Sequence, residues 1–142
     1  MKKLINTSFL YLILALAAGV FYREFTKFNG FTGRTTLGVI HTHLFVLGVL
    51  LFLILALFAN SRPDILENRR AKTFYIMQNI SLILFSAALL VRGIMQVLNI
   101  QLSAAANSTI SGIVGVTHIM LTISLVLFFL LLKSVSKEAA VE

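Results

Sequence analysis

Three histidines are the residues of this chain best suited to chemistry, and all three lie inside apolar runs. His41 and His43 fall within GVIHTHLFVLG, residues 38–48, and His118 lies in the last apolar run. An ionisable side chain at membrane depth is costly and is usually retained for a function. Imidazole is a common ligand of metal ions and of haem iron. These histidines are therefore the first candidates for a cofactor site.

The spacing of His41 and His43 prevents them from ligating one metal ion together. Each residue turns a helix by about 100°, so residues two apart point about 200° away from each other. The face of His41 also carries Gly38 and Gly48, which leaves space for a flat ligand beside the backbone. The face of His43 carries branched side chains instead. We therefore expect the two histidines to serve different neighbours.

Depth along the predicted helices relates His118 to the other two histidines. His43 lies about 14 Å beyond Arg34, and His118 about 16 Å beyond Asn107, at the helical rise of about 1.5 Å per residue. His41 lies about 10 Å deep by the same measure. Two imidazoles on different helices at one depth are suited to axial ligation of a haem. The sequence thus predicts a non-covalent haem b, its iron ligated by His118 and by His41 or His43.

Two arginines are candidates for binding the haem propionates. Arg92 lies about 9 Å inside the outer end of the third apolar run, where a guanidinium requires an anionic partner. Arg23, at the outer end of the first run, is the second candidate. Glu24 is the competing anion, because pairing with Arg92 or Arg23 would make that arginine structural. The sequence leaves propionate binding and internal pairing open.

Small residues surround His118. Ser111, Gly115 and Thr122 share its predicted helix face, and Gly112 lies beside them. Small side chains allow helices to approach closely, and the same feature leaves space for a macrocycle. Helix packing alone is the commoner explanation of such a stripe, so only the histidine on this face favours haem.

Two other interpretations compete with haem. The three histidines and Glu24 are ligands that suit zinc or copper, although the spacing of His41 and His43 opposes a shared first shell. Alternatively, the chain binds no cofactor and acts as a transporter subunit, an assembly factor or a partner of a larger complex, with its histidines bridging helices. No nucleophile with a base and no phosphate-binding loop is present, so no complete catalytic constellation is visible. If the chain is redox-active, bis-histidine ligation favours electron transfer over oxygen reduction.

Hydropathy predicts the elements that position these residues. The chain of 142 residues is 58% apolar with a mean hydropathy of +0.96, and a soluble domain is nearer half apolar. Four runs reach the roughly 20 residues needed to cross a bilayer, and none alternates as a barrel strand would. We predict one all-α domain over residues 1–142, a four-transmembrane-helix bundle with helices at about 4–22, 37–58, 73–98 and 110–132. The first run resembles a secretory signal, but its continuation into an aromatic and basic cluster predicts a retained helix.

Charge and cysteine content limit the partners and the location. The net charge of +7 comes from lysines and arginines at the ends of the apolar runs, which predicts contact with the lipid bilayer and not with nucleic acid. Eight basic residues fall on one side of the predicted membrane and four on the other, so both termini are predicted to be cytoplasmic. The absence of cysteine excludes disulfides, thiolate metal sites and covalently attached haem.

The segment FYREFTKFNGFTGRTTLGVIHTHLFVLG, residues 21–48, resembles an uncharacterised family of small four-helix bacterial membrane proteins, a domain of unknown function. This resemblance implies a multi-pass protein of the bacterial cytoplasmic membrane. It implies no particular activity.

The His-x-His of helix two is also similar, more distantly, to the haem-copper oxidase and nitric oxide reductase superfamily. There the two histidines of such a helix serve different haems, a second helix supplies the opposing ligand, and four helices form one of three arcs. The similarity implies a b-type haem held by His41 or His43 with His118 opposite, in electron transfer or in haem or gas sensing. The other histidine would face another cofactor or a neighbouring protomer, and we expect a homo-oligomer, a dimer or a trimer. Because the chain lacks the histidines of the copper or iron centre, the similarity does not imply oxygen or nitric oxide reduction by one protomer.

Overall fold

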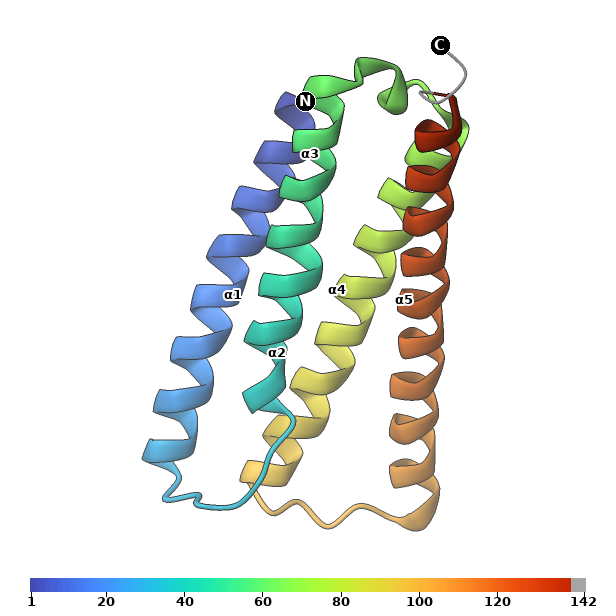
Figure 1. Ribbon diagram of the computed structural model, residues 1–142. Helices are drawn as coiled ribbons and strands as arrows, with labels where there is room; N and C mark the ends of the chain where they lie inside the picture. Colours follow the sequence, from blue (N-terminus) through green and yellow to red (C-terminus); the bar gives the residue numbers. More distant parts are fainter. Residues whose placement is uncertain (139–142) are drawn as a thin grey trace.

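The computed structural model describes the backbone of residues 1–138 and the side chains of residues 1–135, and helices joined by short connections make up this part of the chain (Figure 1). Residues 139–142 of the predicted domain lie outside the described residues. Three long helices are α1 (Lys2–Phe28), α4 (Arg69–Val97) and α5 (Ala104–Glu138). The second membrane-length segment is composite and consists of α2 (Leu37–His43), the π-helix η1 (Leu44–Leu50) and α3 (Leu51–Ser61). A short 3₁₀ helix, η2 (Pro63–Leu66), leads to α4.

The predicted all-α fold with four membrane-length helices is confirmed. Four helical segments are long and apolar enough to cross a membrane, and no residue in 1–138 lies in a strand. The helices extend past the apolar runs, since α1 continues to Phe28 and α5 begins at Ala104. Polar residues continue a helix where its backbone bonds remain satisfied, so the apolar run marks only the central part of each span. Which side of the membrane holds the termini stays a prediction.

The four segments stand in a row that follows the chain order (Figure 1). α1 packs along α2, η1 and α3, this composite segment packs on α4, and α5 packs on α4. Within the described residues α5 has no comparably extensive contact with any other helix. The row therefore leaves much of α5 uncovered, and its core is the set of seams between consecutive helices.

A series of aromatic contacts joins the four segments. The ring of Tyr11 in α1 stacks on Phe52 in α3 at 5.9 Å, and Phe52 lies 6.1 Å from Phe74 in α4. Phe74 in turn lies 5.1 Å from Phe128 in α5. These centroid separations fall within the favourable range for aromatic pairs. Because all four rings are almost fully buried, this series fixes the lateral position of each helix in the row.

The π-helix η1 begins directly after His43 and changes the helix register there. The backbone N–H of Leu51 donates to the carbonyl of Val46, five residues earlier. Carbonyls that lose their regular partners need others. The carbonyl of Leu47 accepts a bond from Gln78 Nε2 at 3.0 Å, and that of Val49 accepts one from Ser8 Oγ at 3.0 Å. Both neighbouring helices therefore hold the π-helix in place.

The register change alters the faces predicted for an unbroken helix. An unbroken helix would place Phe45, Gly48 and Phe52 on one face with His41. In the structure Phe45 lines a hollow with His41 and is 41% exposed, whereas Phe52 is fully buried. The wider π turn rotates the residues after His43 relative to those before it.

Candidate functional site

His43 is the last residue of α2, and a hydrogen bond fixes its tautomer. Its Nδ1 lies 2.8 Å from the carbonyl oxygen of Val39, one turn earlier. A carbonyl only accepts, so Nδ1 carries the proton in this bond and Nε2 is the nitrogen that points away from it. A metal-ligating histidine is usually oriented by a bond of this kind from its other ring nitrogen. The His43 imidazole is thus held as a ligand that would act through Nε2.

Phe85 of α4 contacts both His43 and His118. Its ring centroid lies 5.1 Å from that of His43 and 5.1 Å from that of His118, with tilted rings in both pairs. The two imidazoles are therefore separated by at most twice that distance, which agrees with the matched depths predicted from the sequence. Phe85 is 3% exposed, whereas His118 is exposed on α5. The structure brings together His43 and His118, from helices that do not pack directly on each other.

His41 points to the other side of α2, toward α1. Its Cβ lies 3.8 Å from the position that a Cβ on Gly19 of α1 would occupy. Its Nδ1 is buried and has no hydrogen-bond partner in the described structure. The ring lines a shallow apolar hollow of about 220 Å³ together with Ala15, Leu16 and Phe45. The structure does not bring His41 to His118.

The glycines on the His41 side accommodate tyrosines of α1. A Cβ on Gly48 would lie 2.5 Å from Cγ of Tyr11, and one on Gly38 would lie 3.3 Å from the ring of Tyr22. The space predicted here for a flat ligand is therefore filled by these two side chains. The error arose because hydropathy does not reveal which side chain of a neighbouring helix faces a glycine.

Arg92 binds Ser111 across the contact between α4 and α5. Its Nη1 donates to Ser111 Oγ at 2.8 Å. Arg92 also lines a hollow of about 260 Å³ with Gln96, Gln101 and Asn107. Within residues 1–135, no carboxylate forms an ion pair with Arg92. The guanidinium therefore keeps its full charge in a polar hollow.

Phe85, Arg92, Ser111 and His118 form one surface, which we call the α4–α5 seam. Phe85 and Arg92 are seven residues apart on α4, and Ser111 and His118 are seven apart on α5. Seven residues are about two helical turns, or roughly 10 Å. The seam therefore carries an imidazole and an unpaired guanidinium about two turns apart on one side of the molecule.

Arg23 lies away from this seam. Its Nε is 3.8 Å from Glu24 Oε1, and its side chain is 81% exposed. Such an exposed pair contributes little to stability. Of the two pairings left open for Glu24, the structure thus has the one with Arg23. Arg92 instead donates to Ser111, so in the described residues the two arginines have different partners.

The small residues near His118 are not used for packing within the chain. A Cβ added to Gly112 or Gly115 would meet no atom within 4 Å. Ser111, His118 and Thr122 are exposed on the same helix. Their face of α5 is therefore available to a cofactor, lipid or another protein.

The residues for a three-ligand metal site are not assembled. No three side chains of histidine, cysteine, aspartate or glutamate gather within the described part of the chain. His41 faces α1, while His43 and His118 meet at Phe85. The arrangement suits two imidazoles in one site better than three with Glu24.

Sequence reasoning missed Phe85 as a residue of the candidate site. It lies in ISLILFSAALL, residues 80–90, where an apolar aromatic residue is expected in any membrane helix. The one available signal was its separation of seven residues from Arg92. That signal gains meaning only when His43 and His118 are placed around the ring.

Comparison with known proteins gives a family and no activity. No curated protein and no solved structure matches the chain. A family model described as "Protein of unknown function (DUF2871)" matches residues 1–135. The match spans all four membrane-length segments and every candidate residue above. The chain therefore belongs to the DUF2871 family of proteins of unknown function.

Proposed function

We propose that the protein binds haem b non-covalently in a membrane and works in electron transfer or in haem or gas sensing. The observation that carries the proposal is the shared contact of His43 and His118 with Phe85. Two imidazoles from different helices then contact one and the same side chain. Placing an ionisable side chain in hydrocarbon costs free energy, so such residues usually mark a functional site.

The chemistry of the donor set fits a haem. Val39 holds the His43 ring so that Nε2 is the nitrogen free to bind. His118 is exposed and has no hydrogen bond to its ring within residues 1–135. A bound haem would supply one-electron redox chemistry, and two histidine ligands would leave no open iron position. The chain's residues would orient the group and exclude water.

Phe85 contacts both imidazoles, so the size of its side chain should affect how a haem fits beside them. The open surface beside Gly112 and Gly115 offers volume next to His118. We therefore expect Phe85→Leu, which shortens the side chain, to keep or raise haem uptake. Phe85→Trp should lower it. Titration of the two purified variants with hemin would compare their affinities directly.

Arg92 is the better of the two propionate candidates. It shares the seam with His118 and has no carboxylate partner in the described side chains, whereas Arg23 pairs with Glu24 on α1. A guanidinium binds a carboxylate through charge-assisted hydrogen bonds. Ser111 would hold the Arg92 side chain toward the α4–α5 seam.

The finer aspects of location and assembly belong to the same proposal. The protein would lie in a bacterial cytoplasmic membrane with both termini in the cytoplasm, as the basic residues favour.

A homo-oligomer, a dimer or trimer, is supported by the polar face that α5 exposes at membrane depth. Gly115→Leu should then weaken self-association, measured by light scattering of the detergent-solubilised protein. An unchanged mass would count against α5 as the contact.

An absorption spectrum tests the proposal. The protein is purified in mild detergent, supplemented with hemin, and measured oxidised and after dithionite reduction. A reduced α band of the b type is expected. His118→Ala or His43→Ala should remove the bis-histidine spectrum, whereas His41→Ala, the matched control, should keep it. An unchanged spectrum in His118→Ala would rule out this ligand.

A cofactor-free membrane protein, acting as a partner of a larger complex, a transporter subunit or an assembly factor, is the second candidate. The observation in its favour is that both imidazoles already pack on the ring of Phe85. His43 would then be a helix-bridging residue. Protein that stays colourless with added hemin would support this function over the first. Metal in elemental analysis without Soret absorption would instead support divalent-metal binding.

A further inference from the structure

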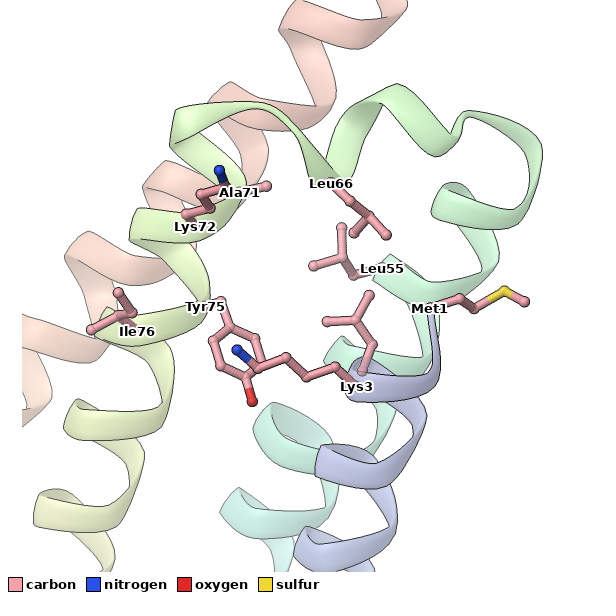
Figure 2. A pocket seen from close by; sticks show the side chains of 9 residues that line it. Met1, Lys3, Leu55, Leu66, Ala71, Lys72, Tyr75 and Ile76 are labelled. Carbon is pink, nitrogen blue, oxygen red and sulfur yellow. The ribbon is translucent and has the colours of Figure 1, made fainter.

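A cavity of about 410 Å³ lies between the first turn of α1, the end of the second segment and the first turns of α4 (Figure 2). Its wall is mainly apolar and includes Leu4, Leu55 and Leu66. Leu4 and Leu55 are almost fully buried behind it. The volume is in the range of small-molecule sites, roughly 300 to 1,000 Å³. The cavity is thus large enough for part of a ligand with an apolar chain.

Two lysines from different helices line the same cavity. Lys3 belongs to α1 and Lys72 to α4, and no acidic residue lines the cavity with them (Figure 2). The Nζ of Lys3 lies 4.3 Å above the ring of Tyr75. The Tyr75 hydroxyl is itself bonded to Thr7 Oγ1 at 2.8 Å.

The contact with Tyr75 holds the Lys3 ammonium without neutralising it. A cation over an aromatic ring is attracted by the ring quadrupole and keeps its charge. Within residues 1–135 neither Lys3 nor Lys72 forms an ion pair with a carboxylate. The cavity therefore combines an apolar wall with two positive charges that the described side chains leave without an anion.

We propose that this cavity binds an anionic phospholipid, with its phosphate between Lys3 and Lys72 and the start of an acyl chain along Leu4, Leu55 and Leu66. Charge complementarity selects this occupant, because an apolar wall with two cations fits a molecule with an anionic head and an apolar tail. The cavity also lies where α1 and α4 begin, next to the basic residues Lys2, Arg69 and Arg70. Basic residues at helix ends mark the membrane–water interface, where such lipids reside. The proposal does not rest on haem binding.

The test is native mass spectrometry of the full chain, delipidated in detergent and incubated with one lipid at a time. The lipids are dioleoylphosphatidylglycerol, the zwitterionic dioleoylphosphatidylethanolamine and oleate. We expect the phosphatidylglycerol adduct to exceed both others at equal concentration. Lys3→Gln and Lys72→Gln should each lower its affinity about fivefold, the effect of one basic residue near anionic lipid.

Matched variants separate this site from general surface charge. Lys2→Gln and Arg70→Gln remove one charge at the same helix ends but lie outside the cavity, so the adduct should persist. Lys3→Arg and Lys72→Arg retain charge and should retain binding, which excludes misfolding as the cause of a loss. Equal losses in all four glutamine variants would overturn the site. Equal binding of the zwitterionic lipid, or stronger binding of oleate, would overturn the phospholipid assignment.

Discussion

Polar side chains in the seam between α1, η1 and α4 are mostly hydrogen-bonded within the chain, although Gln78 Oε1 has no partner there among the described residues, whereas the α4–α5 seam exposes more of its polar groups. In the first, Ser8 bonds to the Val49 carbonyl, Tyr11 to Asn79 and Gln78 to the Leu47 carbonyl. In the second, His118 is exposed and Arg92 has no carboxylate partner among the described side chains.

This difference separates structural from functional candidates. A polar side chain that hydrogen-bonds within the chain has a structural role, because the bond removes the cost of an unpaired backbone or side-chain group in hydrocarbon. Arg92 has a hydroxyl partner in Ser111 but no carboxylate among the described side chains, so its charge and the exposed His118 imidazole need another explanation. The contrast points to the α4–α5 seam as the place where an external group binds.

The glycines of the two regions should differ most in their effect on stability. A Cβ on Gly93 would lie 2.6 Å from Leu37 Cγ and 2.8 Å from the Leu37 backbone nitrogen. Backbone cannot move aside cheaply, so Gly93→Ala should destabilise the protein by about 1–3 kcal/mol. Gly115→Ala has open space and should be neutral or stabilising by up to about 1 kcal/mol. Thermal unfolding in one detergent, followed by circular dichroism, compares the two; equal losses would contradict this packing.

Replacing Arg92 and replacing Arg23 should have different effects on the protein's affinity for haem, but similar effects on its stability. A hydrogen bond to a charged group contributes about 1.5–3 kcal/mol, so Arg92→Gln should weaken hemin binding by roughly tenfold to a hundredfold. Arg23→Gln should leave it unchanged, since Arg23 already pairs with Glu24 on α1. Hemin titration by absorption measures both variants. A greater loss in Arg23→Gln would place the propionates elsewhere.

Removing one hydrogen bond from the seam between α1, η1 and α4 should have the smallest effect on stability. Tyr11 donates its hydroxyl to Asn79 Oδ1 at 2.9 Å, and interhelical bonds in membranes contribute about 0.6 kcal/mol on average. Tyr11→Phe should lower stability by about that amount and leave hemin binding intact. Ser111→Ala in the α4–α5 seam should do the reverse, with little loss of stability and weaker hemin binding because Arg92 is no longer held. If Tyr11→Phe changed hemin binding, the assignment of a structural role to the first seam and a binding role to the α4–α5 seam would be wrong.

The sequence was sufficient to predict the four membrane-length helices. This prediction depends on hydropathy and on the rise per residue, which are quantities that act along one helix. Gln78 and Asn79 both form interhelical hydrogen bonds, which lower the cost of these polar side chains in hydrocarbon.

Features that depend on a neighbouring helix could not be predicted. HTHLFVLG, residues 41–48, is predicted as regular helix, whereas the structure has a π turn there with Ser8 and Gln78 bonded to two of its carbonyls. Gly38 and Gly48 are filled by tyrosines whose positions follow from the packing of α1. Phe85 gained its place in the site in the same way, through contacts from α2 and α5.

The most direct test of the central claim is the dithionite-reduced spectrum of hemin-supplemented protein, compared between His118→Ala and His41→Ala. A b-type α band that His41→Ala keeps and His118→Ala loses is the predicted result. If the wild-type protein stays colourless, or if His118→Ala keeps an unchanged bis-histidine spectrum, the α4–α5 seam is not a haem site.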